Sequence, residues 1–276
     1  MSRFAVNCSI LFTEVPLLER PAAAAEAGFG AVEFWWPFDT PTPAPAAVAA
    51  FERSLDDAGV QLIGLNFAAG DLGAGWRGLL SQPANVGRFH DNIDVAVGIA
   101  ERTGCRALNA LYGNRVDGED PGRQDELAIA SLTVAAQAAE RIGAVVLVEA
   151  LNTPENPHYP LVSSEGVIAV LDRVAAPGAV DNVAFLADLY HLARMGEDPI
   201  AVVRDHIDRI GHVQIADTPG RHQPGTGDLD VDGVLAALDE VGYDGWVALE
   251  YDPQGPSADS FDWLPRARRA AARTDA

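Results

Sequence analysis

The sequence predicts a single (β/α)₈ barrel, and three observations lead to this fold class. Short apolar runs rich in β-branched and aromatic residues alternate with longer, Ala-rich segments of helical periodicity. Eight such units can be counted along the chain. The chain has 276 residues, of which 48% are hydrophobic, and a barrel of this kind typically needs about 250 residues. We therefore expect one domain that spans residues 1–276.

The eight expected strands are the apolar runs that follow turn signals. Several come shortly after a glycine, as at Gly28, Gly59 and Gly143, and glycine is typical of helix C-termini. An open doubly wound sheet is the alternative fold, but it usually has a Gly-rich phosphate-binding turn after its first strand, and residues 7–12 contain no glycine. The expected strands are residues 4–9, 31–34, 61–66, 107–111, 145–149, 183–188, 210–215 and 246–250.

The charge and the basic residues exclude several classes of function. The formal net charge is -21, which would repel nucleic acid phosphates, so we expect no nucleic acid partner. All 19 basic residues are Arg and none is Lys. No internal side chain can therefore form a Schiff base with a carbonyl substrate, which excludes lysine-type aldolases and transaminases.

The sequence shows no membrane or secretion segment. No apolar run approaches the roughly 20 residues needed to span a bilayer, and the apolar stretch 4–12 is short and interrupted by Asn7 and Ser9. Cys8 and Cys105 cannot form a disulfide framework, and we expect both thiols to be buried. These features predict a cytoplasmic protein without a membrane partner. A homo-oligomer is possible, since surface helices of barrels often form dimers.

Four successive expected strands end in a polar residue that can bind a metal. They are closed by Glu149, Asp188, Gln214 and Glu250. The active sites of (β/α)₈ barrels form at the C-terminal ends of the strands, so these side chains should converge on one mouth. Three carboxylates and an amide oxygen suit Mg²⁺ or Mn²⁺. The alternative is that each polar residue only marks the point where its strand leaves the core and becomes exposed to solvent. Four successive strands with the same placement favour a metal site.

Glu149 and Glu250 are the candidate acid/base pair. Their strands lie three steps apart in an eight-stranded ring, so the two carboxylates would approach a substrate from opposing sides. A carboxylate that removes a proton next to a carbonyl, with a second that returns one, gives isomerisation or epimerisation through an enediolate. The alternative is that both glutamates serve only as metal ligands, while water or His191 moves the proton.

Several motifs give the chain a family resemblance over nearly its whole length. They include the stretches 32–34, 188–191, 212–217 and 220–227, of which Gln214-Ile215-Ala216-Asp217 followed by Pro224-Gly225-Thr226-Gly227 is the most specific. With these motifs the chain resembles the hydroxypyruvate isomerase family, within the xylose isomerase-like TIM barrels.

The resemblance implies roles for particular residues. Glu149 and Glu250 would be catalytic and metal-binding, Asp188 and Gln214 would complete the coordination, and Asn66 would bind substrate. The implied reaction interconverts hydroxypyruvate and tartronate semialdehyde, or a related 2-oxo-tetronate pair.

Two departures from the family pattern bear on the substrate. Ala150 stands where proline is expected, and the loop 153–160 is divergent, which could alter substrate choice. Related epimerases tend to have His where this chain has Gln214, so this residue favours the isomerase branch.

Other polar residues are candidates for substrate binding. A keto acid or sugar acid brings its own carboxylate into an acidic mouth, so Arg77 and Arg221 are expected to bind it; the alternative is a surface or ion-pair role. His191, expected in the loop above the sixth strand, could contact a substrate oxygen or orient a ligand. Glu33 could bind substrate hydroxyls or form an ion pair in the barrel mouth, and His212 should lie one layer below Gln214.

Three other functions remain compatible with the same residues. A ketose 3-epimerase would use the glutamate pair across one carbon, and an inosose-type dehydratase would expel a β-hydroxyl from the enediolate. A non-catalytic sugar-binding barrel would bind its ligand without exchanging the α-protons.

Overall fold

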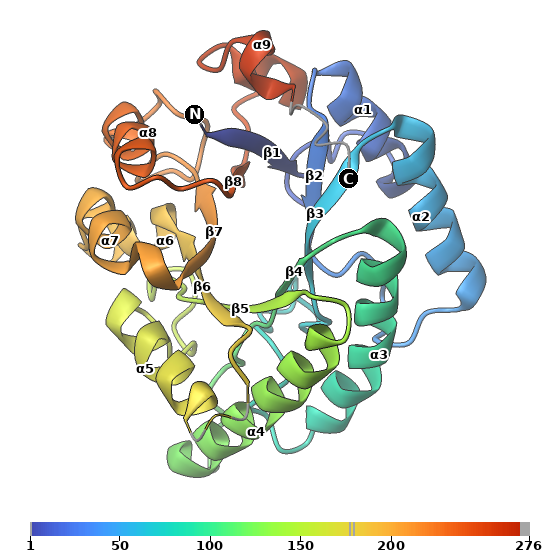
Figure 1. Ribbon diagram of the computed structural model, residues 1–276, viewed down its shortest axis with the longest axis vertical. Helices are drawn as coiled ribbons and strands as arrows, with labels where there is room; N and C mark the ends of the chain where they lie inside the picture. Colours follow the sequence, from blue (N-terminus) through green and yellow to red (C-terminus); the bar gives the residue numbers. More distant parts are fainter. Residues whose placement is uncertain (1, 177, 179, 271–276) are drawn as a thin grey trace.

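The computed structural model describes residues 2–176, 178 and 180–270, which form a closed barrel of parallel strands ringed by helices (Figure 1). Each strand pairs with the next in sequence, and β1 pairs with β8 to close the ring. This topology confirms the predicted (β/α)₈ fold. The strands are β1 Arg3–Asn7, β2 Ala31–Phe34, β3 Gln61–Asn66, β4 Ala107–Asn109, β5 Val145–Glu149, β6 Val183–Asp188, β7 Ile210–Ile215 and β8 Trp246–Leu249.

The helices begin and end at recognisable capping residues. The side chains of Asp120 and Ser163 cap the N-termini of α4 and α5, and α2 and α3 end at Gly59 and Gly104, both in the left-handed conformation. The α-helices are α1 Arg20–Glu26, α2 Pro45–Ala58, α3 Val86–Thr103, α4 Pro121–Glu140, α5 Ser164–Ala175, α6 Leu189–Arg194, α7 Pro199–His206, α8 Val231–Glu240 and α9 Arg266–Arg269. Short 3₁₀ helices are η1 Leu17–Glu19, η2 Ile207–Arg209 and η3 Ser257–Phe261.

The predicted boundaries of three strands were wrong by one or two residues. β1 ends at Asn7 rather than residue 9, because the carbonyl of Asn7 accepts a hydrogen bond from the amide of Leu11 and the chain turns. β4 and β8 end before Ala110 and Glu250, although the amides of both residues still donate to the neighbouring strand. These differences do not change which side chains face the barrel interior.

Side chains two residues apart on a strand point to the same side, so the barrel interior contains successive layers of side chains of two kinds. Small apolar side chains such as Ala5, Ala31 and Ala248 are buried together. Two residues further along the same strands, Asn7 and Glu33 point to the same side and are also buried. The interior is therefore apolar at one level and polar at the C-terminal ends of the strands.

Two further expectations can be compared with the structure. Cys8 and Cys105 are free and buried, as predicted. Among the described residues, no helix is long and apolar enough to cross a membrane.

Candidate active site

A buried polar layer lies at the C-terminal mouth of the barrel. The strand register aligns Asn7 with Glu33, Asn66 with Asn109, and Asp188 with Gln214. The polar residues in or just after the strands are 9% exposed or less, and buried groups of this kind need hydrogen-bond or metal partners. They are Asn7, Glu33, Asn66, Asn109, Glu149, Asp188, Gln214 and Glu250.

Glu250 is surrounded by hydrogen-bond donors. Its Oε1 accepts from Asn7 Nδ2 at 2.8 Å and from Trp35 Nε1 at 2.6 Å, with Gln214 Nε2 at 3.3 Å. Its Oε2 accepts from Arg221 Nη2 at 2.6 Å. Burial raises the pKa of Glu250, whereas the positive charge of Arg221 acts to lower it.

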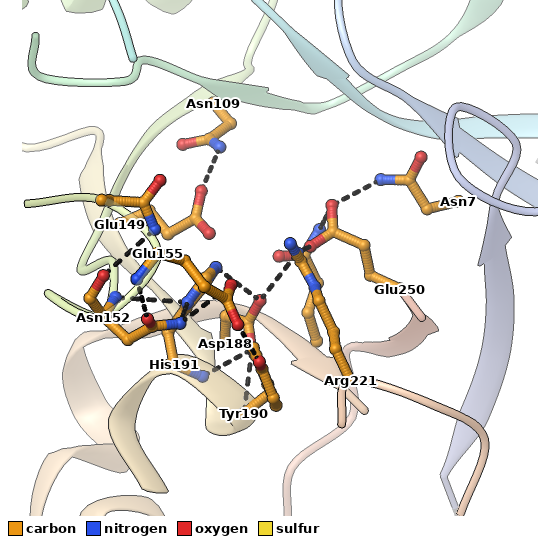
Figure 2. Close-up of polar contacts among 12 residues, drawn as sticks. Asn7, Asn109, Glu149, Asn152, Glu155, Asp188, Tyr190, His191, Arg221 and Glu250 are labelled. Atoms are coloured by element: carbon orange, nitrogen blue, oxygen red, sulfur yellow. Dashed lines mark hydrogen bonds and ion pairs between the residues drawn. The ribbon is translucent and has the colours of Figure 1, made fainter. Parts of the chain in front are cut away.

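Glu149 has a much poorer set of partners on the other side of Asp188 (Figure 2). Its Oε2 accepts from Asn109 Nδ2 at 2.8 Å. Burial, followed by repulsion from Glu250 and Asp188, raises the pKa of Glu149 well above its ordinary value. The site therefore holds two carboxylates in equally buried but electrostatically different positions.

Asp188 both begins helix α6 and faces the site. Its Oδ1 accepts from the backbone amides of Tyr190 at 2.9 Å and His191 at 3.2 Å, which caps the helix. Its Oδ2 is 3.6 Å from His191 Nε2 and 3.8 Å from Arg221 Nη2. Burial and the charge of Glu250 raise the pKa of Asp188. The helix begins at once, so the prediction that His191 lies in a loop was wrong.

His191 is held in one tautomer. The backbone amide of Asn152 donates to His191 Nδ1 at 3.2 Å, so Nδ1 is an acceptor and a neutral ring carries its hydrogen on Nε2. Burial, followed by the charges of Arg221 and Arg77, lowers the pKa of His191 well below its ordinary value. The Nε2–H group therefore faces Asp188.

The donor set fits a divalent cation. One ligand atom each from Glu149, Asp188 and His191 lie within 4.8 Å of one another. Asp188 Oδ2 and Gln214 Oε1 are buried and have no hydrogen-bond partner within the described part of the chain. Oxygen-rich ligand sets suit Mg²⁺ or Mn²⁺, and His191 lies beside the oxygens of Glu149 and Asp188. Glu250 lies outside this group, and its Oε2 accepts from Arg221.

A cavity of about 300 Å³ opens above these residues, and two guanidinium groups face it. Arg77 is anchored by the carbonyls of Leu72 and Trp76 and by the side chain of Asn156. Burial, followed by the charge of Arg221, lowers the pKa of Arg77. The lining includes Trp35, Asn66, Arg77, Glu149, Glu155, Asn156, His191, Arg221 and Glu250.

Arg221 is carried by a loop organised around Asp217. The Asp217 carboxylate is 1% exposed and accepts only from backbone amides in the contacts described. Arg221 itself has a φ of +57°, which is uncommon for a residue with a side chain. The amides come from Thr218, Gly225, Thr226, Gly227 and Leu229. This loop holds the guanidinium between Asp188 and Glu250.

Comparison with known proteins gives this fold and site a family. The xylose isomerase-like TIM barrel family matches residues 21–267. The chain belongs to this family. A Streptomyces coelicolor relative, provisionally named a hydroxypyruvate isomerase, is 58% identical over 272 residues, which are 98% of each chain. The 2-oxo-tetronate isomerase of Pectobacterium atrosepticum is 32% identical over 95% of this chain and 97% of its own.

Three further proteins are similar to this chain in sequence or fold. The hydroxypyruvate isomerase of Escherichia coli is 30% identical over 96% of this chain and 98% of its own. A crystal structure named AP endonuclease, family 2, from Brucella melitensis superposes with a TM-score of 0.86 at 37% identity, covering 95% and 98% of the two chains. A D-psicose 3-epimerase structure, with a TM-score of 0.73 and 18% identity over 90% and 84%, shows the same fold.

In this xylose isomerase-like barrel, six of the nine predicted site residues line one cavity. Asp188 and Gln214 are absent from its described lining, and so is Glu33. The Glu33 carboxylate accepts hydrogen bonds from Asn7, Gln214 and His212 below the cavity. In this structure Glu33 contacts side chains of the barrel, and its substrate-binding role stays a prediction; His212 lies in the deeper layer as expected.

Sequence reasoning missed several residues that contact the two glutamates. Asn7 and Asn109 end their strands as the carboxylates do, so the same strand-end signal was available for both. Trp35 follows β2 and donates from its indole Nε1 to Glu250, a contact that the strand-end pattern does not indicate. Glu155 lines the cavity and accepts from the hydroxyl of Tyr190.

Proposed function

We propose that this protein is a hydroxypyruvate isomerase, which interconverts hydroxypyruvate and tartronate semialdehyde with Glu149 and Glu250 as its acid/base pair. The observation that carries the proposal is a single cavity lined by two buried carboxylates and two guanidinium groups. Beside it lie two buried oxygens, of Asp188 and Gln214, that have no hydrogen-bond partner among the described residues. The names of the 58% and 30% identical relatives support it. The AP endonuclease name is not transferred, because a net charge of -21 would repel DNA.

The proposed cofactor is Mg²⁺ or Mn²⁺. Glu149, Asp188, Gln214 and Glu250 would hold it, with His191 close to the same position. When bound, the ion would polarise the substrate carbonyl and stabilise negative charge on the adjacent oxygens. Arg221 would then be released from Glu250 to meet the substrate.

The remaining steps belong to side chains of this protein. Arg77 and Arg221 bind the substrate carboxylate, which offsets its repulsion by the acidic mouth. One glutamate removes a proton from C3, which leaves an enediolate across C2 and C3. The other returns a proton to C2, while the C3 hydroxyl proton passes to the C2 oxygen, so the product is an isomer of the substrate.

The test is NMR of the purified enzyme with hydroxypyruvate in D₂O, with Mg²⁺ or Mn²⁺ and with chelator. The proposal expects metal-dependent deuterium uptake and the appearance of tartronate semialdehyde. Formation of tartronate semialdehyde should be lost in Glu250→Gln, and both signals should be kept in Arg204→Gln, a control on the exposed pair with Glu240. Binding of short keto acids without any exchange would refute the isomerase and leave a non-catalytic barrel.

A 2-oxo-tetronate isomerase is the second candidate, and the cavity volume favours considering it. About 300 Å³ is more than a three-carbon acid fills, and Glu155 and Asn156 in its wall can accept or donate to an extra hydroxyl. The Pectobacterium relative is named for this activity. Parallel measurement of kcat/KM for both acids decides between them. Epimerase or dehydratase activity would appear in the same spectra as C3 inversion or loss of water.

We also propose a cytoplasmic location. Cys8 and Cys105 are both free and fully buried, and unpaired thiols are usual in a reducing compartment. Cell fractionation with an antibody to the protein tests this assignment.

A further inference from the structure

A buried carboxylate below the cavity has partners that suggest a role of its own. Glu33, on β2, is 3% exposed. Its Oε1 accepts from Gln214 Nε2 at 2.6 Å and Asn7 Nδ2 at 2.9 Å, and its Oε2 accepts from His212 Nε2 at 2.6 Å. All three donors are buried side chains of the barrel, so both oxygens of Glu33 are occupied from within the protein.

The contact with Gln214 fixes which end of that amide faces the mouth. A carboxylate accepts hydrogen bonds and donates none when ionised, so Glu33 selects the nitrogen of the Gln214 amide through the shorter of its two contacts, 2.6 Å against 3.3 Å to Glu250 Oε1. The oxygen of the amide must then point elsewhere. Gln214 Oε1 is buried, and none of the described residues donates a hydrogen bond to it. An unpaired buried carbonyl is unfavourable unless a ligand supplies the missing partner.

The barrel also provides space for Glu33. On the neighbouring strand β3, a Cβ added at Gly64 would lie 3.1 Å from Glu33 Oε2 and 3.2 Å from Glu33 Cβ. These contacts are tighter than usual, so a side chain at this position would require Glu33 to shift by a few tenths of an ångström. The register of β2 against β3 also shifts between Val32 and Glu33, and such irregularities redirect side chains.

We propose that Glu33 is a positioning residue that holds the carbonyl oxygen of Gln214 toward a divalent cation in the mouth. The proposal rests on the metal site of the proposed function and deepens it. Glu33 touches neither the ion nor the substrate; it acts through the Gln214 amide, and His212 holds Glu33 from below. Outer partners of metal ligands commonly change metal affinity by about 10- to 100-fold when they are removed.

The test measures Mn²⁺ affinity by isothermal titration calorimetry, with Mn²⁺ electron paramagnetic resonance as a second readout, and needs no substrate. Glu33→Met keeps the length of the side chain and removes both acceptors, so we expect about 10- to 100-fold weaker binding. Gln214→Ala should weaken binding similarly. The double variant should bind no more weakly than Gln214→Ala, because Glu33 has nothing left to orient.

Two further variants separate positioning from general damage to the fold. His212→Phe removes a donor to Glu33 but leaves the bond between Glu33 and Gln214, so Mn²⁺ affinity should stay within about threefold of the parent protein even if stability falls. Glu33→Gln keeps a neutral acceptor for Gln214 and should weaken binding by about three- to tenfold, since charge-assisted hydrogen bonds are stronger. This variant also replaces Glu33→Met if the latter does not fold.

The outcomes are distinct. If the parent protein does not bind Mn²⁺, the metal site fails and this inference fails with it. If the parent binds and the folded Glu33 variants bind equally tightly, only the role of Glu33 is refuted. Additive losses in the double variant would also refute it, because Glu33 would then act independently of Gln214.

Discussion

The two sides of the mouth hold equally buried glutamates in different surroundings. Glu149 is 5% exposed and Glu250 is 3% exposed. In the part of the chain that the structure describes, Glu250 accepts from three neutral side chains and one guanidinium, whereas Glu149 accepts from Asn109. Burial raises the pKa of both groups, but strong counter-effects act on Glu250 from Arg221 and Trp35. Burial alone therefore does not set the chemistry of a strand-end carboxylate.

This difference assigns different tasks to the two residues. A carboxylate that is stabilised in its charged form is a weaker base. We therefore expect Glu149 to remove the proton from carbon and Glu250 to complete the transfer. The following predictions test this asymmetry, beginning with the largest effect.

Replacing either glutamate by glutamine should lower kcat by about 10²- to 10⁴-fold, because each loses a general acid or base. Proton abstraction comes first, so Glu149→Gln should also abolish deuterium uptake from D₂O into hydroxypyruvate. Glu250→Gln should retain a small residual uptake. These are measured by NMR under single-turnover conditions. Residual deuterium uptake in Glu149→Gln, with none in Glu250→Gln, would contradict the assignment of Glu149 as the base.

Metal binding should stabilise the parent protein and distinguish ligands from their neighbours. Mn²⁺ at 100 times its Kd adds about 2.7 kcal/mol to the free energy of unfolding, which corresponds to a rise in Tm of roughly 5–10 °C. Glu149→Gln should lose most of this rise, because it removes a proposed metal ligand. Trp35→Phe should keep it, because the Trp35 indole donates only to Glu250 in the described contacts. Differential scanning fluorimetry with Mn²⁺ or chelator measures the shift.

Removing a hydrogen-bond donor to Glu149 should shift the pH dependence of kcat/KM more than removing a donor to Glu250. Asn109 Nδ2 favours the charged form of Glu149, so Asn109→Leu should raise the pKa of that carboxyl. The acid limb of kcat/KM should then move to higher pH, by roughly one unit. Trp35→Phe should move it less, since Asn7 and Gln214 still donate to Glu250. Equal shifts in the two variants would remove the contrast between the two sides.

The smallest effect concerns stability without metal. The folded-state pKa of Glu149 is raised, so its contribution favours folding at low pH and is lost as pH rises through the folded pKa. Glu149→Gln should therefore raise Tm at neutral pH in chelator and leave it nearly unchanged near pH 4. The expected rise is roughly 2–4 °C for each kcal/mol relieved. A lower Tm of Glu149→Gln at neutral pH would contradict this, because it would mean that the ionised Glu149 carboxylate stabilises the folded protein.

Most of the fold and the acidic residues of the site were accessible to sequence reasoning. Strand periodicity is local, so it located all eight strands, and the carboxylates that close them were visible at once. The contacts of Glu33 were not, because they depend on the register shift in β2 and on space at Gly64. The helical position of His191 was also missed, since Asp188 serves as both the helix cap and a site residue.

The partners of Glu250 have a consequence for how the protein is made. They come from β1, from the segment after β2 and from β7 and its loop, while Glu250 follows β8, which pairs with β1. During synthesis, most of these donors emerge from the ribosome long before the carboxylate that they hold. A nascent or truncated chain that lacks the last strand and Glu250 has an incomplete mouth and lacks one of the two proposed acid/base groups. Catalytic turnover by this enzyme therefore also indicates that β1 has paired with β8.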